Sequence, residues 1–175
     1  PLNLEDRIAL HVRMANAYGD AYLRQGVQDG EKFVEVWKFH PDCMYASPYF
    51  TGDEAFKLSE FPEESARAST MEAKVYSLRF PDWKPVDFKF WPADNGFVMK
   101  TRWQGTTKDG TTMGFYSYSF VDTNEAGEVA RWETHVNDEY SPFLKVAIGV
   151  SGPFHGTSEY VDALHRCLDK AGVSL

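Results

Sequence analysis

The fold is decided by the stretch WKPVDFKFWPADNGFVMKTRWQGTTKDGTTMGFYSYSFVDTNEAGEVARWETHVND, which runs from Trp83 to Asp138. Apolar and polar residues alternate along it with the period of two that is typical of strands. Turn signals interrupt it at Asp94–Gly96, Lys108–Gly110 and Thr123–Gly127. The stretch therefore predicts four consecutive antiparallel strands, at Val86–Trp91, Phe97–Thr107, Thr112–Asp122 and Val129–Asp138.

Helical periodicity flanks this run of strands on both sides. A helix is expected over Asn3–Gln25, capped by Asn3, and a longer one over Glu63–Arg79 behind Pro62. The other expected elements are a short helix from Asp29, a strand at Cys43–Phe50, a weak helix at Glu54–Glu60, and helices at Ser141–Val150 and Ser158–Lys170. This order predicts an α+β fold with helices packed on one side of a curved sheet.

Composition limits the class of protein. A chain of 175 residues suits one domain. Of its residues 43% are hydrophobic and 15% are aromatic, which is more than a core of this size needs. The surplus favours an apolar pocket, an oligomer interface or both. The net charge is −8, and Lys and Arg form no block, so neither nucleic acid nor a membrane surface is an expected partner. No long apolar run or signal segment occurs, and we expect a cytoplasmic protein with two free thiols.

The turns also predict how the strands pair. Counting back from each turn gives the expected opposing pairs Lys100–Tyr118, Arg102–Tyr116, Tyr118–Trp132 and Tyr116–Thr134. One face of the sheet would then gather these cations, tyrosines and Trp132. Such a face favours a lined cavity over a dry core, so we expect it to form the functional site. Glu133 and His135 would lie on the opposite face and serve a dimer contact, or act as a pH switch, since a neighbouring carboxylate raises the pKa of a histidine.

The long middle helix carries the first candidate pair, Glu72 and Tyr76, one turn apart. A carboxyl group that faces an aromatic cavity loses water, which raises its pKa and suits general acid or base catalysis. The alternative is an ordinary glutamate on a solvent-facing helix surface.

The sheet face supplies a second group of candidates. Lys100 and Arg102 beside Tyr116 and Tyr118 could hold a substrate oxyanion, or could only fill a sheet face by cation–π contacts. Candidate substrate-binding residues are Tyr45, Tyr49, Tyr76, Trp132, Thr134 and Asp138. For the aromatic members core packing is the alternative role, and Asp138 could be a turn former.

No motif calls for a metal or a cofactor. The five histidines have no H-x-x-x-H or H-E-x-x-H spacing, and the two cysteines are far apart. Nucleophile-elbow, phosphate-loop and dinucleotide glycine signatures do not occur in the sequence. We therefore expect neither metal nor cofactor.

In the order and spacing of its segments the chain resembles the nuclear-transport-factor-2-like superfamily, near the SnoaL-like polyketide cyclases. The resemblance rests on FPDW (Phe80–Trp83), GFVMKTRWQGTT (Gly96–Thr107), YSFVDTNEAGEVARWETHVND (Tyr118–Asp138) and KFHPDCMYASPYF (Lys38–Phe50). FPDW and the strand after it look most like the phenazine-biosynthesis A/B-type proteins. The resemblance covers about residues 3–150, which leaves residues 151–175 as a C-terminal extension of a single domain, 1–175.

The resemblance implies a cone-shaped α+β barrel with helices on its concave side, an apolar pocket inside it and a homodimer packed sheet to sheet. It also implies an acid/base group at Glu72, with Tyr76 one turn on. Thr134 stands where the hydrolases and cyclases often have Asp or Glu. Arg102 matches an arginine of the epoxide-hydrolase branch, but Gln104 replaces the neighbouring Asp of that branch, which argues against that activity.

The superfamily also contains cofactor-free lyases that remove formaldehyde from lignin-derived diarylpropanes, and an aromatic-rich chain without cofactor motifs fits that substrate class by analogy. The sequence thus predicts a cofactor-independent lyase for an aromatic, phenolic small molecule. Glu72, Tyr116 or Tyr118 would move the proton, and Arg102 and Lys100 would steady the developing charge. The alternatives are a polyketide- or phenazine-type cyclase, isomerase or condensing enzyme, and a non-catalytic binding or dimerisation module.

Overall fold

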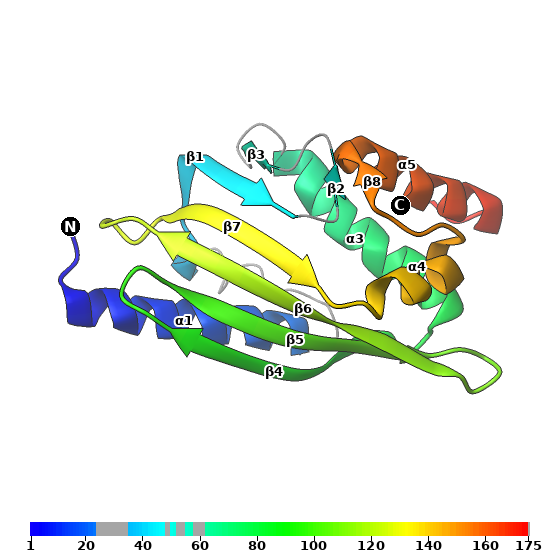
Figure 1. Cartoon of the computed structure of the whole chain (residues 1–175), viewed down its shortest axis with the longest axis horizontal. Coiled ribbons are helices and arrows are strands. Elements are labelled where there is room, and N and C mark those ends of the chain that lie inside the picture. Colours follow the sequence, from blue (N-terminus) through cyan, green and yellow to red (C-terminus); the bar gives the residue numbers. More distant parts are fainter. Residues whose placement is uncertain (24–34, 48–49, 52–54, 58–61, 175) are drawn as a thin grey trace.

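The computed structural model describes residues 1–23, 35–47, 50–51, 55–57 and 62–174. Their elements, in chain order, are α1 (Leu4–Leu23), β1 (Phe39–Ala46), β2 (Phe50–Thr51), β3 (Ala55–Lys57), α3 (Pro62–Arg79), β4 (Lys84–Pro92), β5 (Gly96–Thr106), β6 (Thr112–Thr123), β7 (Val129–Val136), α4 (Tyr140–Ile148), β8 (Phe154–His155) and α5 (Gly156–Ala171). Helices and strands are segregated along the chain, and the predicted α+β class is confirmed (Figure 1).

The main sheet is curved and has six strands in the order β3-β1-β7-β6-β5-β4. Strands β4 to β7 form the predicted antiparallel meander. β1 pairs with β7 in parallel, which makes the sheet mixed rather than wholly antiparallel. A separate pair, β2 with β8, joins the segment before α3 to the start of α5.

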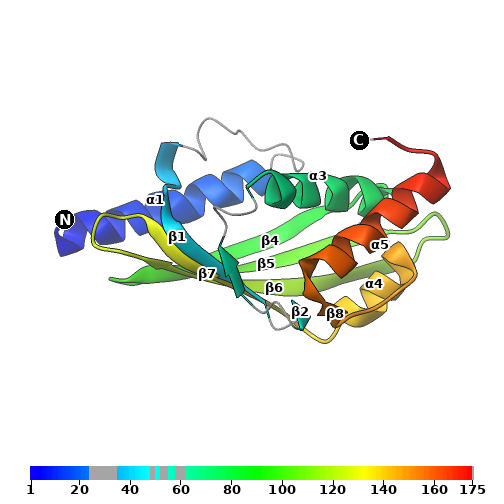
Figure 2. The same ribbon diagram turned by 90° about the horizontal axis from the view of Figure 1, so that it is seen from above.

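The described helices lie on the concave side of this sheet, which they contact through two hydrophobic clusters. α1 and α3 lie on the same side of the strands, and α4 and α5 pack beside α3 at one end (Figures 1 and 2). The α1 cluster contains Met14, Phe97, Met99 and Val121, among others. The second cluster joins α3, α4 and α5 to the other end of β5 and β6. None of the described helices is long and apolar enough to cross a membrane.

Short sequence signals, such as capping residues, predicted where most helices and strands begin and end. Asn3 caps α1, accepting a hydrogen bond from the Asp6 amide at 2.9 Å, as predicted. The weak helix predicted at Glu54–Glu60 is wrong where the structure describes it, because Ala55–Lys57 is strand β3, paired with β1. Edge pairing thus overrode a weak helical preference. Most of the short helix predicted from Asp29 lies outside the described residues.

A buried histidine fastens α1 to the sheet. His11 is 0% exposed; its Nδ1 lies 2.7 Å from the Ala93 carbonyl oxygen, and its Nε2 lies 2.6 Å from the Thr123 hydroxyl oxygen. A carbonyl oxygen only accepts, so Nδ1 donates, and in the neutral ring Nε2 accepts from Thr123. Burial lowers the pKa of His11 below its ordinary 6.5, and nearby Arg7 acts in the same direction. The neutral imidazole is therefore the form that holds the helix in place.

This arrangement predicts a pH-dependent effect of His11→Gln. The variant is expected to lower the free energy of unfolding by about 1–3 kcal/mol at alkaline pH, because a buried bonded group is lost. The difference from wild type should shrink as pH falls below 6.5, the ordinary histidine pKa, since the unfolded wild type then binds a proton that the folded ring resists. Urea unfolding across pH measures this. His165→Gln, at an exposed site on α5, is the control, and a pH-independent difference would contradict the role of His11.

Candidate functional site

The strongest candidate site is a carboxyl group among phenols, where α3 meets α5. The Tyr160 hydroxyl on α5 donates a hydrogen bond to Oε1 of Glu72 on α3, at 2.6 Å. The same hydroxyl is also hydrogen bonded to that of Tyr76. Glu72 and Tyr76 are one helical turn apart, so both project from the same side of α3. Two segments distant in sequence thus build one connected group of three ionisable side chains.

Burial decides the protonation of this group. It raises the pKa of Glu72 from 4.5 to about 7, and the hydrogen bond from Tyr160 only partly offsets this effect. Burial likewise raises the pKa of Tyr76 and of Tyr160 well above the usual value, and the nearby Tyr140 adds to both shifts. The phenols therefore stay protonated near neutral pH, whereas the Glu72 carboxyl can both accept and release a proton there.

The surroundings explain the loss of water. Tyr76 packs edge-on against Trp83 at 5.4 Å and against Phe143 at 5.1 Å between ring centroids. Tyr76, Tyr140 and Tyr160 all belong to the hydrophobic cluster of α3, α4 and α5. A carboxylate beside this aromatic wall has little solvent to stabilise its charge, which favours the protonated form.

The pairing of β6 with β7 differs from the predicted register. Tyr118 lies opposite His135, and Val121 lies opposite Trp132, whereas Tyr118 was expected opposite Trp132. The shift is three residues, and an odd shift moves every side chain of β7 to the other face relative to β6. The register changes between Asp122 and Thr123, at the end of β6. Counting residues back from the turn assumes a regular ladder, so it could not predict this irregularity.

The faces therefore differ from the prediction. The β5–β6 register is confirmed, with Lys100 opposite Tyr118 and Arg102 opposite Tyr116. The face that the helices cover, however, is the other one, which contains residues of both hydrophobic clusters. On the outer face lie Lys100, Arg102, Tyr116, Tyr118, Phe120, Glu133 and His135. The cations point outward because moving an unpaired charge from water into the protein interior would cost on the order of several kcal/mol per ion.

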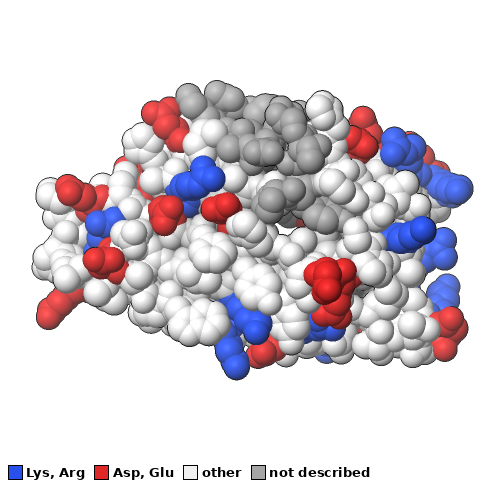
Figure 3. Space-filling view, in the orientation of Figure 1, with Lys and Arg blue, Asp and Glu red and all other residues white. Residues whose placement is uncertain are grey.

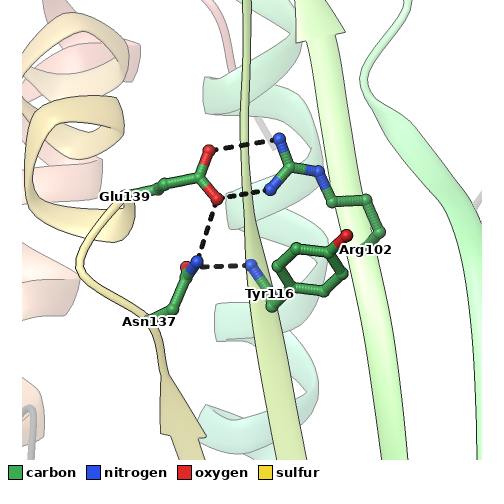
Figure 4. A network of polar contacts seen from close by, with 4 residues as sticks. All are labelled: Arg102, Tyr116, Asn137 and Glu139. Atoms are coloured by element: carbon green, nitrogen blue, oxygen red, sulfur yellow. Dashed lines mark hydrogen bonds and ion pairs between the residues drawn. The ribbon is translucent and has the colours of Figure 1, made fainter.

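The expectation that Lys100, Arg102, Tyr116 and Tyr118 line the interior is therefore wrong. Figure 4 shows what Arg102 does instead: it forms a two-pronged ion pair with Glu139, with N–O distances of 2.6 and 3.2 Å. Asn137 donates to the same carboxylate and accepts from the Tyr116 amide. The guanidinium, with its hydrogen bond to Glu139, lowers the pKa of that carboxyl. Lys100 lies over the Tyr116 ring at 4.7 Å, so both cations serve the outer face.

The candidate substrate-binding residues divide between several places. Tyr45 and Trp132 are paired positions of β1 and β7 on the concave face, with ring centroids 6.2 Å apart. Thr134 also lies on that face, with its hydroxyl 3.2 Å from that of Ser119. Asp138 is exposed in the turn before α4, which fits its alternative role as a turn former. Tyr49 lies outside the described residues.

The sequence analysis missed Tyr160. It predicted a helix over Ser158–Lys170 but did not name Tyr160 as a site residue, although Tyr160 is 3% exposed and Leu164 0%. The spacing of Tyr160, Leu164 and Leu168, four residues each, was the signal that could have identified it. Its contact with Glu72 could not be read from sequence, because the two residues are 88 positions apart.

Among the residues that the structure describes, no three His, Cys, Asp or Glu side chains gather as a metal site. Cys43 is buried, Cys167 is partly buried, and both are free thiols.

Comparison with known proteins adds the fold class. No protein-family model matches the chain, and no curated protein sequence matches it. Solved structures with a similar fold include a protein described as SnoaL-like, and this likeness supports the α+β fold alone.

A particular example is a protein from Jannaschia sp. CCS1 assigned as a SnoaL-like polyketide cyclase. It aligns with a TM-score of 0.50 and 13% identity over 79% of this chain and 94% of that chain. A phenazine biosynthesis-related protein from Pseudomonas aeruginosa aligns with a TM-score of 0.46 and 15% identity over 83% of this chain and 91% of that chain. At such identity, the first likeness shows a shared fold and nothing about the reaction.

Proposed function

We propose that this protein is a cofactor-independent acid/base enzyme that acts on an aromatic small molecule on the concave side of its sheet, with Glu72 as the proton carrier. The observation that carries the proposal is the Glu72 carboxyl itself, which accepts a hydrogen bond from Tyr160 at 2.6 Å and has a pKa raised to about 7. General bases work best when their pKa lies near the working pH. Glu72 is half-buried, and an acid whose pKa is shifted by loss of water beside a specific partner is a candidate functional residue.

The oxygen charge that develops on the substrate needs stabilisation, and the phenols take this role in place of Lys100 and Arg102. Tyr76 and Tyr160 remain protonated near neutral pH because burial raises the pKa of each. Before the reaction the Tyr160 hydrogen is donated to Glu72 and the Tyr76 hydrogen to Tyr160. Once Glu72 has taken up the substrate proton, its carboxyl group can donate to Tyr160, and the Tyr160 hydroxyl can then turn its own hydrogen towards the developing oxyanion. In the proposed reaction Glu72 removes a proton from the substrate and later returns it.

For the reaction we propose an elimination or carbon–carbon cleavage on a phenolic diaryl compound of the lignin-derived class. The abundance of aromatic residues around Glu72 supports an aromatic substrate. The same proton transfer would serve a cyclase or an isomerase, and one protein of similar fold is assigned as a polyketide cyclase.

The experiment is a turnover panel with three arms: diarylpropane diols, linear polyketide-like phenols, and compounds that isomerise by proton transfer. Product formation by wild type in one arm, lost in Glu72→Gln, identifies the reaction. Binding of panel compounds without turnover, with the same affinity in Glu72→Gln, would overturn the enzymatic proposal and favour a non-catalytic binding module.

We also propose that the outer face of the sheet contacts a second copy of the chain. This face carries Trp91 and Phe120, which are 52% and 43% exposed, and the adjacent rings of Tyr116 and Tyr118. In Figure 3, which views this side of the molecule, uncharged atoms cover much of the centre, with a few charged side chains among them. Exposed apolar patches of this kind favour association of protein surfaces.

The proposal predicts that wild type sediments as a species of twice the chain mass of 19.9 kDa, and that Phe120→Asp sediments as a monomer. A buried, unpaired carboxylate in each protomer would cost more than the contact contributes. Val150→Asp is the matched control, since Val150 is similarly exposed, at 41%, but lies outside the sheet. Analytical ultracentrifugation separates the outcomes: a wild-type monomer, or dimers in both variants, would contradict this interface.

A further inference from the structure

A patch of hydroxyl groups interrupts the concave face between the two hydrophobic clusters. On each of β5, β6 and β7, the residues at one end belong to the α1 cluster and those at the other end to the α3–α4–α5 cluster. The positions between them are, without exception, serine or threonine. We call them the hydroxyl patch: Thr101, Ser117, Ser119 and Thr134.

The four residues are contiguous. Thr101 is opposite Ser117, Ser119 is opposite Thr134, and Ser117 and Ser119 are successive residues of one face of β6. Thr101 is 2% exposed and Ser119 is 5% exposed. Ser117 and Thr134 are half-buried. The patch is therefore a largely buried polar surface flanked by apolar walls, an arrangement that costs free energy unless its hydrogen bonds are satisfied.

The described residues satisfy only part of the hydrogen-bonding capacity of the patch. Among the described residues, the patch side chains take part in two hydrogen bonds: Trp103 Nε1 donates to Ser117 Oγ at 3.0 Å, and the Ser119 and Thr134 hydroxyls share one at 3.2 Å. Only that shared bond uses a hydroxyl hydrogen, so three of the four hydrogens have no acceptor in the part of the chain that the structure describes. The Thr101 side chain has no hydrogen bond to a described residue.

Two neighbours connect the patch to the rest of the site. Towards Glu72, Trp103 stacks on Trp83 at 6.1 Å, and Trp83 contacts Tyr76 at 5.4 Å. Towards the other cluster, Trp132 precedes Thr134 on the same face of β7, and its buried Nε1 has no hydrogen-bond partner in the described structure. Spare donors thus concentrate between aromatic walls, on the side of the sheet that α3 covers.

We propose that the hydroxyl patch binds the neutral carbonyl oxygen of the aromatic substrate. The inference rests on the proposed function, since it names the class of compound that the Glu72 site takes: aryl ketones or quinones rather than aryl carboxylates. Hydroxyl hydrogens match a carbonyl acceptor. The concave-face positions of β5, β6 and β7 carry no charged residue that could pair with a carboxylate, and an unpaired charge there would be strongly disfavoured.

Three probes that share a phenol ring test this by calorimetry at mildly acidic pH: 4-hydroxyacetophenone, 4-ethylphenol and 4-hydroxybenzoate. Wild type should bind the ketone about five- to tenfold tighter than 4-ethylphenol, as expected for one neutral hydrogen bond, and the carboxylate more weakly than either. Equal binding of the first two probes, no binding of the ketone, or tightest binding of the carboxylate would each overturn the proposal without any variant.

The isosteric variants Thr101→Val and Thr134→Val should each reduce the preference for the ketone while leaving 4-ethylphenol binding within about twofold. Thr106→Val is the matched control, because its hydroxyl contacts that of Thr112 at 3.4 Å towards the far end of β5, and it should keep the full preference. A ketone preference that survives both patch variants would contradict the assignment. Because binding is measured without turnover, loss of the ketone preference and loss of Glu72-dependent catalysis are separate results.

Discussion

Replacing Glu72 with glutamine is expected to reduce kcat/KM by about 10²–10⁴-fold on any panel compound that wild type converts. The amide keeps the size of the side chain and can still accept the Tyr160 hydrogen bond at 2.6 Å, but it cannot take up a proton. Losses of this size are typical when a positioned general base is removed. Steady-state kinetics on purified wild type and variant measure the effect.

The pH profile separates a base from a merely structural residue. Wild-type kcat/KM should rise with pH through about 7, where the Glu72 carboxyl ionises. Tyr160→Phe should move this midpoint upward, since the Tyr160 hydrogen bond lowers the pKa of Glu72. Glu125→Gln, in the exposed turn between β6 and β7, is the control and should behave as wild type. Unchanged turnover in Glu72→Gln would remove Glu72 from the reaction.

The same residue has a consequence for stability that needs no substrate. The folded Glu72 holds its proton up to pH about 7, whereas the unfolded residue releases it near 4.5. Between these values the folded state binds more protons, so its stability falls as pH rises, by roughly 3 kcal/mol at about 1.4 kcal/mol per pKa unit. Urea unfolding should show this decrease in wild type and a smaller one in Glu72→Gln. Parallel pH dependences would show that Glu72 is not desolvated.

Phe143→Ala is expected to cost about 3–5 kcal/mol of unfolding free energy, the range for removing a fully buried phenylalanine. Phe143 is 0% exposed and stacks on Trp83 at 4.6 Å between ring centroids. It also contacts Phe80 at 5.1 Å and Phe115 at 5.2 Å, so its removal leaves a cavity among rings that cannot easily close. Denaturant unfolding with linear extrapolation measures the loss.

Val146→Ala provides the comparison on the same helix. Val146 is 40% exposed on α4, and its truncation should change the unfolding free energy by no more than about 0.5 kcal/mol. If Phe143→Ala were as mild as Val146→Ala, α4 would not be the centre of the cluster that surrounds Tyr76. Loss of Glu72-dependent activity in Phe143→Ala at temperatures where it remains folded would further connect this packing to the site.

The sequence correctly predicted those features that depend on residues close together in the chain. The Lys108–Gly110 turn predicted the register of β5 with β6, since a tight hairpin leaves little freedom in how its strands pair. Pro62 marked the start of α3, and the one-turn spacing of Glu72 and Tyr76 placed both on one side of it. In each case the interacting residues are close in the chain, so covalent geometry limits the alternatives.

The predicted pairing of β6 with β7 was wrong, because the connection between these strands is longer and restricts their register less. The longer turn Thr123–Gly127 and the irregularity beside it shifted β7 by three residues, and this odd shift exchanged Trp132 and Thr134 with Glu133 and His135 between the faces. Alternation shows which residues share a face, but not which face the helices cover. That choice follows from burial: apolar surface joins the clusters, and Lys100 and Arg102 remain where water and Glu139 can solvate them.

The sequence by itself therefore determined the α+β architecture, the meander, and Glu72 with Tyr76 as a candidate pair. Only the tertiary structure decided which sheet face is interior, that β1 joins β7 in parallel, and that Tyr160 completes the Glu72 site. The physical reason is distance along the chain. Turns and helical spacing act over a few residues, whereas these contacts join segments held together by burial of apolar surface, which is non-directional and leaves no local signature.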